Sequence, residues 1–315
     1  MKNNNLHSAK KAKNDEFYTT LSDIEKELKH YTEHFKGKVV YCNCDDHRKS
    51  NFFRYFFLNF KALGMKRLIC TGFKKDGHGV KYVTDVGDEN GNGLVDFGEL
   101  ETTELDGDGS YDSPECMKLL EESDIVVTNP PFSLFRPYMK TLVDYGKKYL
   151  VIGNINALKY KEVFPLIKEN KMWLGCTSFN TGMYFGVPED YEYKQTYKFD
   201  RERNGRKVMR VPAVCWFTNL EHSKRHEKLT LVERYDRNEY PKYDNYDAIE
   251  VSHTVRIPKD YSGVMGVPIT FLDKYCPEQF EIVGEANNGS DNEYDLFKPL
   301  LNGKFTYSRI LIRAK

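Results

Sequence analysis

Apolar runs alternate with helical repeats over the first two thirds of the chain. The runs with the length and composition of buried strands are residues 39–44, 67–72, 124–128 and 149–154. Apolar residues recur at helical spacing in the segments between them, over 21–35, 51–63, 114–122 and 133–145. This alternation predicts an α/β fold with a doubly wound, Rossmann-like sheet that is mostly parallel. Two short apolar runs, 172–174 and 214–217, predict an antiparallel edge to that sheet.

Changes in composition predict where the domains lie. Residues 1–14 are rich in Asn and Lys and predict a flexible arm. The alternating pattern fills residues 15–220, interrupted by a Gly- and acid-rich segment, 74–112, that we interpret as an insertion. Residues 221–315 contain more Tyr, Arg and turn residues, and they predict a smaller C-terminal region.

Composition narrows the class of protein. The sequence has no apolar run of the ~20 residues that a membrane helix needs, and its polar start lacks the apolar core of a signal peptide. Its seven cysteines include no Cys-x-x-Cys pair. This number and spacing fit neither a disulfide framework nor a zinc site, so we expect a cytoplasmic protein without a membrane partner.

The net charge of zero conceals an uneven distribution. Residues 84–124 contain fourteen acidic residues and one basic residue, so the rest of the chain carries a net charge of +13. A basic body is compatible with a polyanionic partner. Two basic clusters, 201–210 and 222–226, are candidates for phosphate contacts, although solvated surfaces would produce the same composition.

The acidic segment contains a calcium-loop pattern. Residues 88–99 satisfy the fixed positions of an EF-hand loop, but the flanking residues do not predict the two helices of that motif. A calcium site and a solvated acidic loop are therefore both open interpretations, and we assign no residue to a metal.

The most informative pattern is Asn129-Pro130-Pro131-Phe132, which directly follows the predicted strand 124–128. Two prolines cannot continue a ladder, so Asn129 would lie at the carboxyl end of this strand, where α/β sheets bind ligands. The Asn129 side-chain oxygen and a proline carbonyl can both accept hydrogen bonds beside an aromatic ring. This combination suits a planar amino group conjugated to a ring, such as N6 of adenine.

Polar side chains also follow the first predicted strand. Asn43, Asp45 and Asp46 end the run 39–44, and a carboxylate at this position can hold an amine or a ribose hydroxyl. Because the sequence contains no G-x-G-x-x-G, a nicotinamide dinucleotide is not expected. Capping of the next helix is an equally good explanation of the two aspartates.

Together these motifs resemble the EcoRI-type adenine-specific DNA methyltransferase family, with cofactor motifs before the catalytic motif and the recognition region last. The matching stretches are Asn14 to Thr19, Cys42 to Asp46 with Ser50 to Phe52, Thr128 to Phe135, and Gly266 to Leu272 with Pro277 to Gly284. The resemblance implies S-adenosylmethionine as cofactor and double-stranded DNA as partner. It also raises a cognate restriction endonuclease as a further partner, which the sequence leaves open.

The resemblance also implies roles for individual residues. Asn129 and Pro130 would hold the target amine, with Pro131 in the same catalytic motif and Phe132 stacking on a flipped base. The residues that would contact the cofactor are Phe17, Tyr18 and Thr19 at its methionine end, and Asn43, Asp45, Asp46 and Asp108 elsewhere.

One departure from the family pattern concerns Asp108. Such enzymes often carry Gly-Asp-Phe here, with the Asp on the cofactor adenine, whereas this chain has Ser110 before the aromatic residue. Two alternatives to a DNA methyltransferase remain from the residues alone. One is an enzyme that methylates another planar amine, in RNA or a protein glutamine, and the other is a decayed nucleic-acid-binding module.

Overall fold

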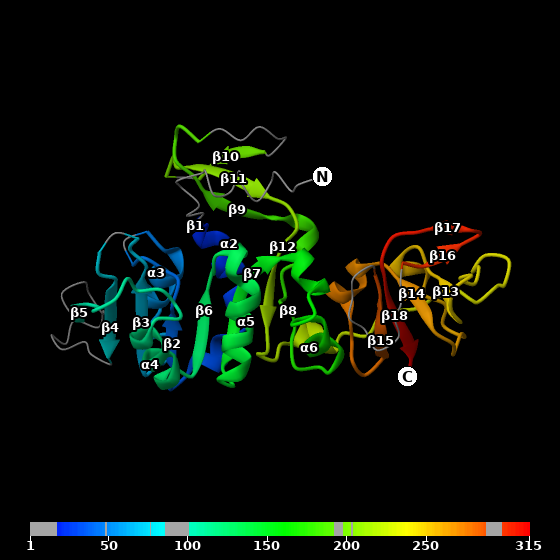
Figure 1. Cartoon of the computed structure of the whole chain (residues 1–315), viewed down its shortest axis with the longest axis horizontal. Helices are drawn as coiled ribbons and strands as arrows, with labels where there is room; N and C mark the ends of the chain where they lie inside the picture. Colours follow the sequence, from blue (N-terminus) through cyan, green and yellow to red (C-terminus); the bar gives the residue numbers. More distant parts are fainter. Residues whose placement is uncertain are drawn as a thin grey trace. The chain divides into compact units, whose positions relative to one another are not determined.

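The computed structural model describes residues 18–47, 49–75, 77–85, 101–191, 198–202, 204–287 and 298–315. The chain forms two compact units (Figure 1). The first unit combines residues Met1–Asn129 and Asn180–Val214, and the second combines Pro130–Phe179 and Cys215–Lys315. Phe17, the arm 1–14 and the calcium-loop pattern 88–99 lie outside the described residues.

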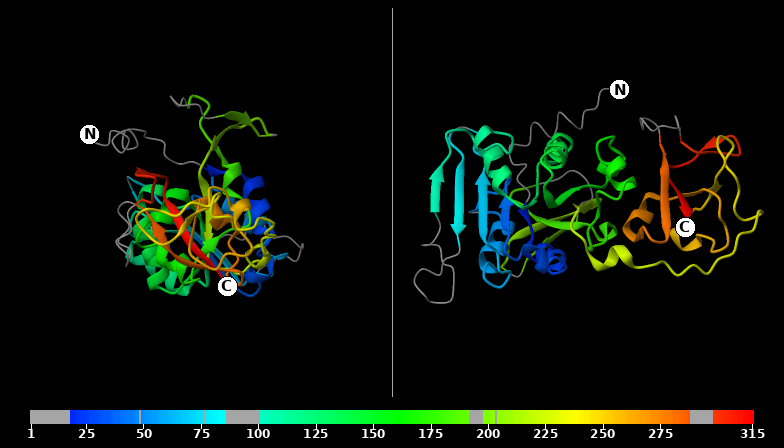
Figure 2. Two further views of the ribbon diagram at one scale, coloured as in Figure 1. Left: turned by 90° about the vertical axis from the view of Figure 1, so that its right-hand side faces the viewer. Right: turned by 90° about the horizontal axis from the view of Figure 1, so that it is seen from below.

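The first unit is built on a mixed sheet. Its strands are, in spatial order, β5 (Glu101–Glu104), β4 (Val80–Asp85), β3 (Arg67–Gly72), β2 (Val39–Cys42) and β6 (Ile125–Thr128). Strand β2 pairs in parallel with β3 and β6, whereas β4 is antiparallel to both β3 and β5 (Figures 1 and 2).

Residues 74–112, for which the pattern predicted an insertion, contribute two strands to this sheet. Strands β4 and β5 extend it next to β3. The connection from β3 to β4 spans only residues 73–79, and a parallel neighbour needs a crossover of about a dozen residues. Because the connection is this short, β4 pairs antiparallel to β3. The described sheet therefore contains fewer parallel pairs than expected.

The three helices of the first unit begin where the periodicity predicted, but only the third also ends there, and the other two end earlier. They are α2 (Leu21–Leu28), followed by the 3-10 turn η1 (Thr32–Phe35), then α3 (Asn51–Leu58) and α4 (Pro114–Glu122). The hydroxyls of Thr20, Ser50 and Ser113 accept backbone N–H groups of the first turns. Helix α3 buries four phenylalanines, Phe52, Phe53, Phe56 and Phe57.

A second, antiparallel sheet in this unit was not predicted. Its order is β1 (Tyr18–Thr19), β9 (Met183–Gly186), β11 (Lys207–Val211) and β10 (Phe199–Arg201). Gly186 lies between two partners, since it pairs with Tyr18 on one side and with Val208 on the other. Strands β10 and β11 stand apart from the β5–β6 sheet of the same unit (Figure 1).

The second unit contains the predicted antiparallel edge. Strand β12 (Val214–Thr218) lies between β7 (Lys148–Asn154) and β8 (Trp173–Leu174), and its pairing with β8 is antiparallel. The other elements of this part are η3 (Phe132–Leu134), α5 (Phe135–Asp144), η4 (Ile155–Lys159), α6 (Phe164–Lys168) and η5 (Phe179–Thr181), whose last two residues belong to the first unit.

The C-terminal part of this unit has its own sheet, with the order β13 (Ile249–Glu250), β14 (Met265–Val267), β18 (Arg309–Ala314) and β15 (Phe280–Ala286). A separate hairpin joins β16 (Leu300–Leu301) and β17 (Lys304–Phe305). The 3-10 turns are η6 (Ser223–His226), η7 (Thr254–Arg256) and η8 (Ile269–Lys274). Arg309 and Glu250, both almost buried, form an ion pair of 2.5 Å.

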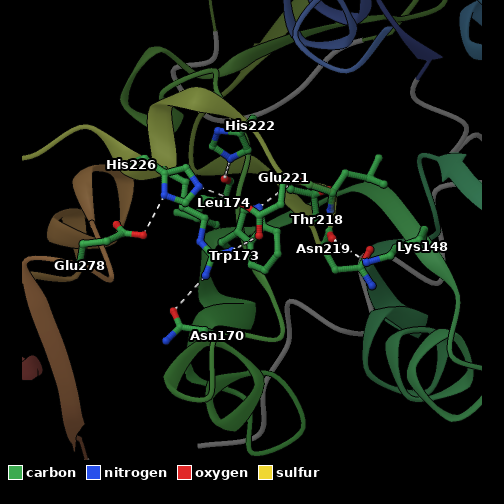
Figure 3. A network of polar contacts seen from close by, with 12 residues as sticks. Lys148, Asn170, Trp173, Leu174, Thr218, Asn219, Glu221, His222, His226 and Glu278 are labelled. Carbon is green, nitrogen blue, oxygen red and sulfur yellow. Dashed lines mark hydrogen bonds and ion pairs between the residues drawn. The ribbon is translucent and has the colours of Figure 1, made fainter. Parts of the chain in front are cut away.

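Polar contacts tie η6 to the C-terminal sheet region (Figure 3). His226 contacts Glu278 at 2.9 Å through Nδ1 and Glu221 at 3.2 Å through Nε2. Hydrogen bonds to Glu278 and Glu221 raise the pKa of His226 above its usual value. Lys224 forms an ion pair of 3.0 Å with the nearly buried Asp273. These contacts hold η6, Pro277–Phe280 and the end of η8 together.

All seven cysteines are free thiols. Within the described ranges, no helix is long and apolar enough to cross a membrane. The same ranges contain no group of three or more His, Cys, Asp or Glu residues that could hold a metal ion.

Candidate active site

Asp45 joins the ends of two neighbouring strands of the first unit. The residue follows β2, is 5% exposed and accepts two hydrogen bonds. Ser50 Oγ donates to Oδ1 at 2.5 Å, and Thr128 Oγ1, on the last residue of β6, donates to Oδ2 at 2.5 Å. Because both carboxylate oxygens are engaged, Asp45 fixes the strand end from which Asn129 continues.

Burial changes the acidity of this carboxyl. Desolvation raises the pKa of Asp45 to about 6, although the hydrogen bonds from Ser50 and Thr128 act in the opposite direction. Asp46, the next residue, is more exposed than Asp45, and its Oδ1 lies 3.4 Å from His47 Nδ1. The more exposed aspartate is the better placed of the two to contact a ligand directly, whereas Asp45 is built into the scaffold.

Asn43 and the start of α3 complete this strand end. Asn43 is buried, and its carbonyl accepts a hydrogen bond from the Thr71 hydroxyl at 3.4 Å. Ser50 Oγ also accepts the backbone N–H groups of Phe52 and Phe53, so one hydroxyl both caps α3 and holds Asp45. The cap of α3 is therefore Ser50 and not either of the two aspartates, for which capping was the alternative interpretation.

Strand β1 brings Tyr18 and Thr19 to the same place. Asn51, the first residue of α3, donates its side-chain N–H to the Thr19 carbonyl at 2.7 Å. Thr19 is 2% exposed, and its Oγ1 has no hydrogen-bond partner among the described residues. Two cations lie near the Tyr18 ring, with Lys49 Nζ 5.9 Å and the Arg206 guanidinium 5.8 Å from its centroid.

The loop that carries Asp108 packs against the end of β3. Gly109 has φ +77°, and a Cβ there would lie 2.5 Å from the Gly72 carbonyl oxygen. A Cβ on Gly72 would lie 3.3 Å from the Asp46 Cα, so Gly72 contacts both segments. Asp108 itself is exposed, and its Oδ1 accepts the Ser110 N–H at 2.9 Å. Its loop, like Asp46, therefore lies beside the ends of strands β2 and β3.

Asn129 is half-buried and directly follows Thr128. The boundary between the two units falls after it, so the following residues belong to the second unit. There Pro130 is buried, Pro131 is exposed and Phe132, at the start of η3, is 39% exposed. A partly exposed phenylalanine after the prolines leaves an aromatic face accessible to a ligand.

The structure therefore unites three motifs that are distant in the sequence. A chain of contacts runs from Thr19 through Asn51 to Ser50, Asp45 and Thr128. Arg206 was considered only as part of a basic cluster, and its contact with Tyr18 follows from the unpredicted second sheet. The sequence did contain one signal for this grouping. Ser50 and Asn51 follow the two aspartates at the end of the first strand, at the distance expected for the cap of the next helix.

These residues fit a polar, nucleoside-containing cofactor. The buried Thr19 Oγ1 has hydrogen-bonding capacity that no described residue uses. Asp46 offers a carboxylate at the carboxyl end of the first strand, where α/β folds hold amines and ribose hydroxyls. An α/β unit with this strand end and an Asn-Pro-Pro-Phe continuation has the features of an amino-group methyltransferase.

Comparison with known proteins identifies the family. The family model described as "Adenine-specific methyltransferase EcoRI" matches residues 5–315, and the chain belongs to this family of adenine-specific methyltransferases. The resemblance inferred from the motifs is thereby confirmed, and the protein is an α/β enzyme with a large mixed sheet.

Similar proteins cover almost the whole chain. The type II methyltransferase M.EcoRI of Escherichia coli is 50% identical over 321 residues, which cover 98% of this chain and 96% of the relative. M.MpnI of Mycoplasma pneumoniae is 42% identical, covering 88% of this chain and 84% of the relative. M.MgeORF184P of Mycoplasma genitalium is 39% identical, covering 98% of each. No solved structure matches the chain.

Proposed function

We propose that this enzyme transfers a methyl group from S-adenosylmethionine to N6 of a flipped-out adenine in double-stranded DNA, as a modification methylase. The family and the relatives named type II methyltransferases support this function. The observation in the structure that carries it is the buried Asp45, whose two oxygens hold the cap of α3 and the end of β6. Asp45 thereby links the proposed cofactor motif to the strand that ends directly before Asn129.

The target nitrogen needs help because its lone pair is delocalised into the adenine ring. S-adenosylmethionine supplies a methyl group activated by the sulfonium. The Asn129 side-chain oxygen and the Pro130 carbonyl, consecutive in the chain, would accept the two amino hydrogens and draw the nitrogen out of conjugation. Methyl transfer would form the N–C bond and leave S-adenosylhomocysteine, and the proton released from the nitrogen would pass to water. Such catalysis consists of positioning and electrostatic preorganisation.

The remaining residues would hold the two substrates. Thr19 and Tyr18 would line the methionine end of the cofactor, and Asp46 its amino group or ribose. Phe132 would stack on the extruded base, which recovers about 1–3 kcal/mol of the cost of leaving the duplex. Asp45 and Ser50 would act through their neighbours, as positioning residues.

The wider organisation is part of the proposal. We propose that residues 15–220 form the methyltransferase domain, with helices on both faces of a doubly wound sheet, and that 221–315 recognise the target sequence. The free thiols fit a reducing compartment, for which we propose the cytoplasm. A cognate restriction endonuclease would be the functional partner of a modification methylase.

The test of this function is Asn129→Ala. The variant should lose methyl transfer by at least about a hundredfold, because the preorganised acceptor is missing, and should keep nearly all of its cofactor affinity. Transfer of labelled methyl groups to DNA, RNA and protein would be measured, followed by mapping of the modified base. Asn59→Ala is the matched control, since it removes a side-chain amide at the end of α3 whose hydrogen bond among the described residues goes to the Tyr55 carbonyl.

Two outcomes would overturn the proposal. Wild-type turnover in Asn129→Ala would show that this side chain does not hold the amine. Methylation of RNA or a protein glutamine, with DNA left unmodified, would assign the enzyme to another planar amine.

A further inference from the structure

Arg206 occupies an unusual position beside strand β1. It lies at the end of the turn between β10 and β11, and its guanidinium packs directly on Gly186 of β9. A Cβ at Gly186 would lie 2.6 Å from the Arg206 Nε and Cζ, so only glycine leaves room for this side chain. The guanidinium is then held 5.8 Å from the centre of the Tyr18 ring.

The neighbouring cations of this sheet already have partners. Arg201 forms two hydrogen bonds of 2.9 Å with the Glu189 carboxylate, and Lys207 Nζ donates to the Glu189 and Tyr191 carbonyls. Arg210 Nε donates to the Thr181 carbonyl at 2.7 Å.

Arg206 differs from all of these. Its guanidinium forms no hydrogen bond or ion pair with any residue in the part of the chain that the structure describes, although the residue is partly buried. A guanidinium that has lost part of its hydration is stabilised by a carboxylate or phosphate, which its planar donors can bind in a bidentate manner.

The surroundings favour a small ligand over the DNA backbone. Tyr18 directly precedes Thr19. The side chain of Asn51, at the start of α3, donates a hydrogen bond to the Thr19 carbonyl. Lys49 adds a second positive charge, with its Nζ 5.9 Å from the centre of the Tyr18 ring. The site is therefore a positively charged position beside the β1 segment, one residue from the buried Thr19 hydroxyl, and Arg206 itself is partly buried.

We propose that Arg206 binds the carboxylate of the methionine moiety of S-adenosylmethionine. Glycine at position 186 leaves the space that the Arg206 guanidinium needs for this contact. This inference rests on the proposed function, because it assumes that the β1 segment lines the methionine end of the cofactor. It assigns a cofactor contact to a β-hairpin that lies far from the cofactor motifs in the sequence.

The experiment compares two ligands that differ only in the carboxylate. Binding of S-adenosylmethionine and of decarboxylated S-adenosylmethionine to the full-length protein, without DNA, is measured by isothermal titration calorimetry. The wild type should bind the carboxylate-bearing ligand about 10–100-fold more tightly, which is the usual contribution of a charge-assisted hydrogen-bond pair. In Arg206→Gln this preference should fall towards one, with the affinity for the decarboxylated ligand unchanged.

Three further variants sharpen the result. Arg201→Gln is the matched control, since its guanidinium is already paired with Glu189, and it should keep the wild-type preference. Gly186→Ala displaces the Arg206 guanidinium without removing it and should show the same selective loss as Arg206→Gln. Arg206→Lys should retain part of the preference, because a point charge replaces the bidentate fork.

The outcomes separate this inference from the proposed function. A wild type that binds both ligands equally, or an Arg206→Gln variant with the wild-type preference, overturns the role of Arg206. If Arg206→Gln keeps its cofactor affinity but binds DNA more weakly, and the slope of log DNA affinity against log salt concentration falls by about one, Arg206 is a phosphate ligand instead. If the wild type binds neither ligand, the proposed function itself fails.

Discussion

Asp45 should make the stability of this protein depend on pH in the opposite sense to an ordinary salt-bridged carboxylate. Burial raises its pKa from 3.8 in the unfolded chain to about 6 in the folded state. A raised folded-state pKa means that the stabilising contribution is fully present below pH 3.8 and is lost as the pH rises through about 6. The perturbation that removes this titration is Asp45→Asn, which keeps the shape of the side chain.

The magnitude follows from the two pKa values. Between pH 7.5 and pH 5.0, protonation of Asp45 in the folded state adds about 1.4 kcal/mol to the free energy of unfolding, out of a full amplitude of about 3 kcal/mol. Asp45→Asn lacks this increment. The difference in unfolding free energy between wild type and variant should therefore shift by about 1.4 kcal/mol in favour of the wild type at the lower pH.

Urea denaturation of both proteins at the two pH values measures this shift. Glu189→Gln is a control for the direction of the effect. The hydrogen bond from Arg201 lowers the pKa of Glu189, so any change in the difference in unfolding free energy between wild type and this variant should have the opposite sign. A wild-type-to-variant difference that is the same at pH 5.0 and pH 7.5 would show that Asp45 is not a desolvated carboxylate.

Three further predictions concern the framework of the site and the contacts of η6. Ser50→Ala should lower the unfolding free energy by about 2 kcal/mol at pH 7.5 in urea denaturation, because one hydroxyl caps α3 and holds Asp45. Asn51→Ala should weaken S-adenosylmethionine binding about fivefold in calorimetry, since Thr19 loses its anchor; unchanged affinity would contradict this. His226→Gln should destabilise the protein more at pH 6 than at pH 9, because the stabilisation linked to the raised pKa of His226 disappears as the pH rises through that pKa; equal losses at both pH values would refute it.

Local patterns were sufficient for the core elements of the fold. The strands β2, β3, β6 and β7 are continuous apolar runs, and such runs are buried in any α/β protein. The caps of α2, α3 and α4 were also predictable, because a Ser or Thr hydroxyl satisfies the backbone N–H groups of the turn that follows it. Helix ends were predicted less well, since apolar spacing continued into turns such as Thr32–Phe35.

Strands β5, β10 and β11 escaped sequence analysis for a common reason. They contain many polar and charged residues, so their sequences lack the apolar signal of a buried strand. They are strands because neighbouring strands of the same chain offer them hydrogen-bonding partners, which is a property of the folded molecule.

The sequence by itself determined the family, the order of the motifs and the chemistry of Asn129-Pro130-Pro131-Phe132, because these depend on residue types and on short spacings. Only the tertiary structure decided which residues meet. It buried Asp45 between Ser50 and Thr128 while leaving Asp46 more exposed, and it placed Arg206 on Gly186 beside Tyr18. Burial, and contacts such as the one that joins Asp45 to Thr128 across 83 positions of sequence, depend on how the sheets are assembled, and no local pattern contains that information.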